Sequence, residues 1–374
     1  MKIVIATDSF KGSLKSFEAC EIIADAIGEF APGVEVVIKP MADGGEGTAE
    51  AMIRAADGRW IERSVMGPLP EMEVEAGFAW FEAERTAVVE MAKASGLELL
   101  RADQMNPLKT TTYGTGELIK AAVEYGAGRI LLAVGGSATV DGGVGAAAAL
   151  GWKFLDGQGQ SIALGGGGLE HIEAIVEPRG LELPAIEVLC DVDNRLCGSE
   201  GAARVYGPQK GANAEMVEQL ESGLSHLADV VRRQLGCEIG EVAGAGAAGG
   251  LAAGAMAFMN GTIVSGVETV INWNNLCAEL ASADWVVTGE GCFDEQSLRG
   301  KVVSGIFKIA RQSQTQVAVL AGQVKVGAEE YQKLGVTTAM ACQSDELSLD
   351  YALKHCRELL GDAARRFAEE YICR

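Results

Sequence analysis

The chain has 374 residues, of which 48% are hydrophobic and 22% are charged, a composition typical of globular proteins and too apolar for a disordered one. Its 52 acidic residues against 31 basic residues give a net charge of -21, which argues against binding to nucleic acid or to an anionic membrane. An anionic substrate would need local binding groups such as backbone N–H groups, a few lysines and a metal ion.

The sequence also argues against membrane spans, zinc sites and secretion. It contains no run of 18 apolar residues, and its start, MKIVIATDSF, reads as a strand and not as a signal peptide. The nine cysteines include no C-x-x-C pair, and the three histidines (His171, His226 and His355) lie far apart. We therefore expect a cytoplasmic protein with reduced cysteines.

The first part of the chain alternates between strand and helix. Residues 2–6 are a short apolar run of strand length, and residues 16–30 have apolar positions at helical spacing, with Ser16 expected as the N-cap. A second strand (34–42) and a second helix (47–56) follow. This order predicts a parallel sheet with crossover helices.

From Arg59 the pattern changes to three successive strands without helices between them, which predicts a mixed sheet. Alternation resumes near Ala283 and ends in a helical segment that begins at Asp350. The predicted strands are 59–67, 71–80, 86–92, 129–138, 283–291, 317–323 and 336–342, and the predicted helices are 115–127, 214–236, 301–312, 327–335 and 350–374.

These segments predict an α/β fold with two α/β domains. The first is discontinuous and comprises residues 1–65 plus 283–374. The second, residues 66–282, is inserted into it and has the mixed sheet. A cleft between the domains is the expected place of the active site.

The residues that follow the predicted strands are rich in glycine, carboxylate and lysine. In open parallel sheets, ligands bind beyond the carboxyl ends of the strands, so these residues are the candidates for a site. They are Asp8, Ser9, Lys11, Asp43, Gly44, Gly45, Gly47, Thr48, Gly135, Gly136, Ser137, Thr139, Asp141, Asp191, Asp193, Lys210, Gly289, Glu290, Gly291, Asp294, Arg299 and Lys301.

This combination is typical of a phosphate site that contains a metal ion. Glycine lets backbone N–H groups approach phosphate oxygens, whereas carboxylates repel phosphate unless Mg²⁺ lies between them or one acts as a base. Asp191 and Asp193 are two apart on an extended chain, so their side chains face the same way and form a plausible shared metal or base position.

Simpler structural roles stay open for the same residues. Asp43 could cap the following helix, Asp191 could be a turn residue, and Lys11 and Lys210 could be solvated surface charges. The stretch GGSATVDGG, residues 135–143, could be a tight turn for close helix packing.

A second glycine pattern, GAGAAG, matches G-x-G-x-x-G at Gly244, Gly246 and Gly249, with Glu268 at about the spacing of a ribose contact. The segment before it matches the pattern of a strand poorly, although a dinucleotide-binding turn should follow a strand. The alanine-rich segment after it has the pattern of a close-packed helix. Neither a Walker G-x-x-x-x-G-K-[ST] motif nor a protein-kinase H-R-D loop is present.

Eight motifs in order carry a resemblance to a known family: DSFKGSL, MADGGEGT, GTGELI, GGSATVDGG, CDVDN, GPQKGA, GAAGGLAAG and TGEGCFDEQSLRGK. Together the sequence resembles the bacterial glycerate kinases of the glycerate 2-kinase type over essentially its whole length. The resemblance implies ATP-dependent phosphorylation of D-glycerate with Mg²⁺ in glyoxylate and glucarate metabolism, with the 2-hydroxyl favoured. It also implies two α/β domains, one flavodoxin-like with a three-layer parallel sheet.

The chain departs from the family pattern at a few positions. Thr7 stands where proline is usual, Cys292 where an arginine is usual, Arg195 where proline is frequent, and Gln323 where serine is common. The positive charge missing at Cys292 could be supplied by Arg195 or Arg299.

The resemblance and the chemistry together predict roles for the candidate residues. The catalytic set is Asp191, Lys11, Asp43 and Lys301, with Asp191 the first choice for the base. The metal ligands are drawn from Asp191, Asp193 and Asp294. The other candidates bind ATP or glycerate, both small molecules, and a homo-oligomer is possible. Two alternatives stay open: an NAD(P)-dependent oxidoreductase that uses the GAGAAG turn, and a non-catalytic protein that binds sugar acids.

Overall fold

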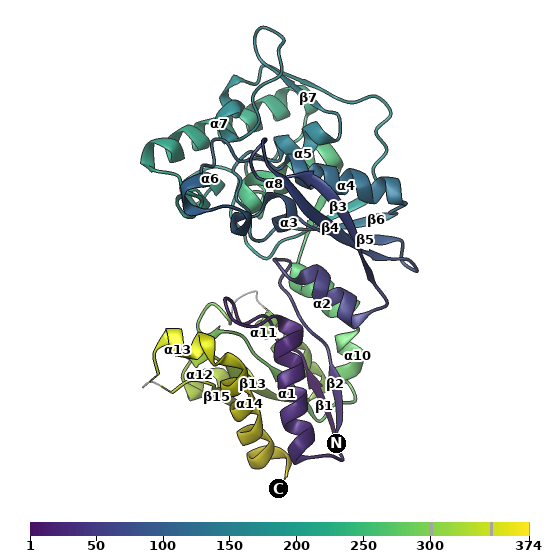
Figure 1. Ribbon diagram of the computed structural model, residues 1–374, viewed down its shortest axis with the longest axis vertical. Helices are drawn as coiled ribbons and strands as arrows, with labels where there is room; N and C mark the ends of the chain where they lie inside the picture. Colours follow the sequence, from purple (N-terminus) through teal and green to yellow (C-terminus); the bar gives the residue numbers. More distant parts are fainter. Residues whose placement is uncertain (299–301, 345–346, 374) are drawn as a thin grey trace. The chain divides into compact units, whose positions relative to one another are not determined.

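The structure is a computed structural model and describes residues 1–298, 302–344 and 347–373. It divides into two compact units, and Figure 1 labels most of their helices and strands. Unit 1 comprises residues 1–43, 50–57 and 267–374, and unit 2 comprises residues 44–49 and 58–266. Unit 1 has a parallel sheet and unit 2 a mixed sheet, which confirms the predicted α/β class.

The unit boundaries differ from those expected from the sequence. Residues 58–65 lie in unit 2 because the strand β3 (Arg59–Met66) pairs with β4 (Glu73–Phe81) along its whole length. Residues 267–282 lie in unit 1.

The sheet of unit 1 has five parallel strands in the order β2-β1-β11-β13-β15. Numbered along the chain of this unit, the order is 2-1-3-4-5, which is the flavodoxin-like order. Its strands are β1 (Lys2–Ile5), β2 (Glu35–Ile38), β11 (Trp285–Thr288), β13 (Gln316–Ala321) and β15 (Thr338–Ala341), with a short parallel pair β12 (Cys292–Phe293) and β14 (Gln323–Val324) beside them.

Helices cover both faces of this sheet. Because side chains alternate along a strand, Ile3 and Ile5 pack with Trp285 against α1 (Ser16–Phe30) and α14 (Cys356–Phe367), which lie side by side (Figure 1). On the other face α11 (Val302–Ser313) contacts β11 and β13. The remaining helices of this unit are α2 (Thr48–Ala55), α9 (Gly266–Trp273), α10 (Leu276–Leu280), α12 (Ala328–Lys333), α13 (Leu349–Lys354) and a π-helix (Ala368–Ile372).

The sheet of unit 2 has the order β10-β9-β6-β5-β4-β3. The three strands predicted after Arg59 form an antiparallel meander, β3, β4 and β5 (Thr86–Glu90), and the other strands are parallel to β5. These are β6 (Arg129–Ala133), β9 (Ala185–Leu189) and β10 (Thr262–Val264), and a separate hairpin consists of β7 (Lys153–Leu155) and β8 (Ala174–Val176).

The helices of unit 2 are α3 (Ala92–Ser95), α4 (Tyr113–Tyr125), α5 (Val144–Ala149), α6 (Ala202–Tyr206), α7 (Ala214–Leu235) and α8 (Ala247–Met259), with 3-10 turns at Leu97–Leu99, Ala102–Gln104, Gly166–His171 and Pro208–Lys210. Strand and helix residues such as Val89, Leu132 and Leu251 form one continuous core. Within the described ranges, no helix is both long enough and apolar enough to cross a membrane.

Candidate functional site

The carboxyl ends of the unit 1 strands are held together by backbone hydrogen bonds between the loops that follow them. The N–H of Asp8 donates to the carbonyl of Gly289 (2.9 Å), and the N–H of Gly322 donates to that of Glu290 (3.1 Å). A Cβ on Gly289 would lie 1.9 Å from the carbonyl oxygen of Leu320, so only glycine fits there. These loops flank the point between β1 and β11 where the strand order reverses, the usual ligand position in this fold.

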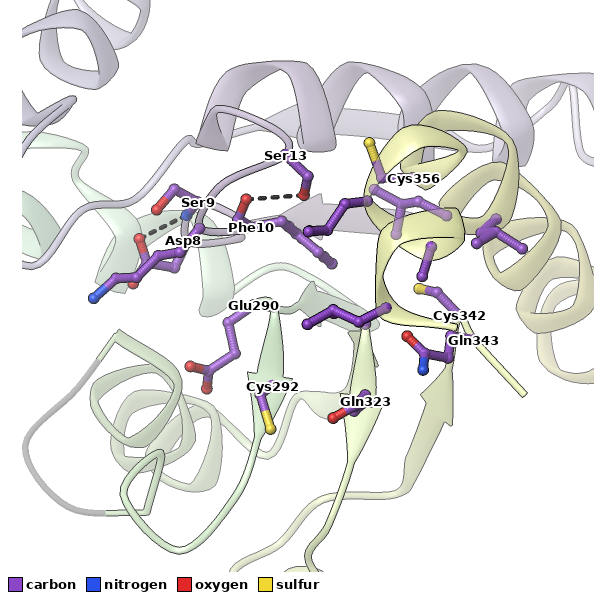
Figure 2. Close-up of a pocket in the computed structure, with 18 of the residues that line it drawn as sticks. Asp8, Ser9, Phe10, Ser13, Glu290, Cys292, Gln323, Cys342, Gln343 and Cys356 are labelled. Carbon is purple, nitrogen blue, oxygen red and sulfur yellow. Dashed lines mark hydrogen bonds between the residues drawn. The ribbon is translucent and has the colours of Figure 1, made fainter. Parts of the chain in front are cut away.

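A cavity of about 300 Å³ opens among these loops and has two different sides. Figure 2 shows Asp8 and Glu290 on one side and Cys342, Gln343 and Cys356 on the other. Asp43 and Lys11 lie near Asp8, on which their charges act together with that of Glu290, and Asp294 also lines the cavity. The second side is mainly apolar and includes Leu349, Ala352, Leu353, Leu359 and Leu360 of α13 and α14. The sequence prediction identified the acidic side but missed the apolar side.

Asp8 has the most unusual environment of these carboxylates. Burial and the nearby charges of Asp43 and Glu290 raise its pKa from 3.8 to about 7, against the opposing effects of the Ser9 N–H and of Lys11. The Ser9 N–H donates to its carboxylate at 2.6 Å. Asp8 can therefore exchange a proton near neutral pH, a property common at functional sites.

In unit 2 the first glycine turn lies against the carboxyl ends of the sheet. Gly44 has φ +85°, and a Cβ there would lie 2.8 Å from the Cβ of Leu189 at the end of β9. The N–H of Ala49 donates a 2.7 Å hydrogen bond to the carboxylate of Glu90, the last residue of β5. Sequence reasoning missed Glu90, although a charged residue that ends an apolar strand is a usable signal.

Asp191 lies two residues beyond the end of β9 and is positioned by a residue that follows the adjacent strand β10. The hydroxyl of Ser265, which directly follows β10, donates to its Oδ1 at 2.7 Å. Asp191 is half-buried, whereas Asp193 is exposed. Ser265 was not among the predicted residues because its segment had no assigned strand.

Asp141, in the second glycine turn, is fully buried and accepts hydrogen bonds from five groups. The donors are the hydroxyl of Thr111, the N–H and hydroxyl of Thr112, and the N–H groups of Gly143 and Gly145, at 2.8–3.3 Å. The carboxylate thus joins the starts of α4 and α5. This arrangement argues against the predicted contact of Asp141 with a ligand, because its acceptor atoms are already used.

Lys210 is also buried and is not the solvated surface charge considered from the sequence. Its ammonium group donates to the hydroxyl of Ser137 (2.6 Å) and to the carbonyl of Thr139 (2.7 Å). Burial lowers its pKa from 10.5 to about 7, against the raising effect of Asp141. Through these two hydrogen bonds Lys210 holds the loop after β6 in place. Its direct contact with a phosphate stays a prediction.

Comparison with known proteins identifies the family. The chain matches the glycerate kinase family over residues 3–371. It is 41% identical to the glycerate 2-kinase of Escherichia coli and 41% identical to the glycerate kinase of Bacillus subtilis, in each case over 98% of this chain and 97% of the relative. The chain belongs to the glycerate kinase family. A crystal structure from Salmonella typhimurium LT2, described as a candidate glycerate kinase 2, has a TM-score of 0.86 at 42% identity and covers 99% of this chain and 97% of its own.

The GAGAAG segment of this glycerate kinase family member does not have the geometry of a dinucleotide turn. A Cβ on Gly246 would lie 2.3 Å from the carbonyl oxygen of Arg195, and one on Gly249 would lie 2.0 Å from that of Thr139. The space beside these glycines is filled by the protein's own backbone. The segment begins α8, as expected from its alanines, but with left-handed residues at Ala248, Gly249 and Gly250.

The remaining predicted residues are placed as follows. Gly45, Gly47 and Thr48 lie in the first glycine turn, and Gly135, Gly136, Ser137 and Thr139 follow β6. Gly291 lies between β11 and β12 and lines the unit 1 cavity with Ser9. Arg299 and Lys301 lie outside the described residues. Among the residues described, no three His, Cys, Asp or Glu side chains form a group that could hold a metal ion.

Proposed function

We propose that this protein transfers the γ-phosphoryl group of ATP to D-glycerate, with the 2-hydroxyl favoured over the 3-hydroxyl as acceptor. The observation that carries the proposal is the family match over residues 3–371, together with 41% identity over nearly the full length of a relative named glycerate 2-kinase. The flavodoxin-like switch point with its cavity and carboxylates supports it, because phosphoryl transfer depends on positioning and charge stabilisation.

The carboxylates of the site fit a requirement for Mg²⁺. Magnesium is usually bound by one or two carboxylates together with phosphate oxygens and water, so a preformed group of three protein ligands is not needed. Its protein ligands would be drawn from Asp191, Asp193 and Asp294, the candidates named from the sequence. When bound, the ion would reduce the charge repulsion between the nucleotide phosphates and these acidic side chains.

The protein's own groups have distinct proposed roles. Asp191 accepts the proton of the glycerate hydroxyl, and the hydrogen bond from Ser265 holds its carboxylate in place. Lys11 and Lys301 balance negative charge on the phosphate or on the glycerate carboxylate. Asp43, which lines the cavity, is the remaining member of the proposed catalytic set. The glycine turns present backbone N–H groups to phosphate oxygens.

The state of the cysteines fits a cytoplasmic enzyme of this kind. All nine cysteines lie within the described residues and have free thiols, which suits a reducing, cytoplasmic compartment. The substrates are small molecules, and no oligomeric partner is required by the proposal.

The test is an ADP-release assay with ATP, Mg²⁺ and a panel of hydroxy acids. The proposal expects ADP formation that depends on D-glycerate. Release of ADP with none of the acids would reject it, and would leave the non-catalytic sugar-acid binding protein in its place. The packing beside Gly246 and Gly249 already disfavours the oxidoreductase alternative.

A further inference from the structure

The cavity of unit 1 offers a ligand two chemically different surfaces. Its lining includes four carboxylates (Asp8, Asp43, Glu290 and Asp294) and a single lysine, and Asp43 and Glu290 gather with the lysine around Asp8. The side away from Asp8 is formed mainly by the apolar side chains of α13 and α14, next to Cys342, Gln343 and Cys356. Leu349 and Leu353 line this side although 63% and 39% of their surface is exposed, so apolar area remains that a ligand can cover.

Glycerate does not match the apolar side of the cavity. A three-carbon acid with two hydroxyl groups has almost no apolar area to bury against α13 and α14. ATP, the larger substrate of the proposed reaction, has the apolar area that glycerate lacks, in the flat ring of its base.

We propose that this cavity binds the adenosine part of the nucleotide donor, with the adenine ring against the apolar wall of α13 and α14 and the phosphates toward the carboxylates. This inference rests on the proposed kinase activity and assigns the nucleotide to unit 1. Two amides line the cavity, Gln343 beside the apolar wall and Gln323 on β14, and a glutamine amide can bond both N6 and N7 of adenine.

The charge balance of the cavity adds a second expectation. Phosphates beside these carboxylates need a divalent cation between them, so ADP should bind tightly only with Mg²⁺. Burial and, after it, the charges of Asp43 and Glu290 raise the pKa of Asp8.

The direct test fills the apolar side with a bulky residue. Ala352 lines the cavity on α13, and Ala352→Trp should raise the Kd of Mg²⁺–ADP in calorimetry at least about 10-fold, while D-glycerate binding is unchanged. Lys354→Trp is the control, because Lys354 is exposed on the same helix, pairs with Asp350 and does not line the cavity. Equal ADP affinity in Ala352→Trp and the parent, or weakened glycerate binding with intact ADP binding, would overturn the inference.

A measurement on the unmodified protein covers the case in which Ala352→Trp fails to fold. Mg²⁺–ADP should slow alkylation of Cys292 and Cys356, which line the cavity, but not of the exposed Cys277 and Cys373. Protection by D-glycerate and not by Mg²⁺–ADP would overturn the inference. Protection by Mg²⁺–ADP without any glycerate-dependent ADP release would reject the kinase activity and leave the nucleotide site standing.

Discussion

Gly135 approaches the first glycine turn so closely that a Cβ on it would lie 2.5 Å from the Cα of Gly45. The turn that precedes α2 therefore rests directly on the turn that follows β6. Two stretches that look like independent motifs in the sequence are one packed structure at the carboxyl edge of the unit 2 sheet. The absence of side chains at both positions is what allows this contact.

Gly135→Ala should disrupt that contact. The added methyl group meets backbone and not a flexible side chain, so we expect a loss of about 1–3 kcal/mol in the free energy of unfolding, measured with urea. Gly28→Ala is the matched control: Gly28 lies in α1 with open space around it, so alanine there should be neutral or slightly stabilising. If Gly135→Ala unfolds at the same urea concentration as the parent, the contact is not close in solution.

Asp141→Asn should reduce stability more than it reduces the activity of the folded enzyme. The new amide group would point a donor at N–H and hydroxyl donors that now bond the carboxylate, a loss of roughly 3 kcal/mol. The comparison is urea unfolding against kcat and KM of the folded protein. A variant of normal stability with a strongly raised KM would show that Asp141 contacts a ligand after all.

Asp8 should make the stability of the protein depend on pH. Its pKa is about 7 in the folded state against 3.8 ordinarily, so between these values the folded state holds more protons and stability falls as the pH rises. The fall is at most about 1.4 kcal/mol per pH unit. Asp8→Asn lacks this pH-dependent loss of stability, so its free energy of unfolding relative to the parent should rise from pH 4 to pH 7.

Asp43→Asn should move the Asp8 effect to lower pH, because the charge of Asp43 is, after burial, the largest cause of the raised pKa of Asp8. Urea unfolding at a series of pH values measures both variants. A stability difference between Asp8→Asn and the parent that is the same at every pH would contradict this account.

Lys210 should give the opposite pH dependence. Burial lowers its pKa from 10.5 to about 7, so between these values the unfolded state holds more protons and the contribution of Lys210 to stability rises with pH. Lys210→Met removes this rise, so its stability relative to the parent should fall between pH 7 and pH 10. A pH-independent difference would mean that Lys210 titrates alike in both states.

Asp191→Asn should slow phosphoryl transfer about 10²–10³-fold with little change in the unfolding temperature, since Asp191 is half-buried and its partner hydroxyl can bond an amide oxygen equally well. Ser265→Ala should have a smaller effect, because it removes only the group that orients Asp191. Turnover of Asp191→Asn within a few-fold of the parent would exclude Asp191 as base and as metal ligand.

The sequence predicts the strands well where an apolar run ends in a glycine turn, as β6 and β11 do. It predicts less well what depends on contacts between distant segments. Ser16 was expected to cap α1, but Lys15 holds the cap position and the Ser16 hydroxyl donates to the carbonyl of Thr7 at 2.8 Å. The burial of Asp141 is likewise decided by Thr111 and Thr112, on a segment about thirty residues away.

The apolar side of the unit 1 cavity could not be predicted for the same reason. The C-terminal segment has an apolar face that reads as an ordinary core-facing stripe. Which of its leucines line a cavity depends on where the loops after β13 and β15 leave space, and no local pattern records that.

Phosphorus NMR of the product formed from ATP, Mg²⁺ and D-glycerate by the purified protein tests the kinase activity and the acceptor hydroxyl together. We expect stoichiometric ADP and a phosphomonoester whose phosphorus couples to the single proton at C2. Coupling to the two protons at C3 would contradict the choice of hydroxyl, and the absence of any new phosphomonoester would contradict the kinase activity itself.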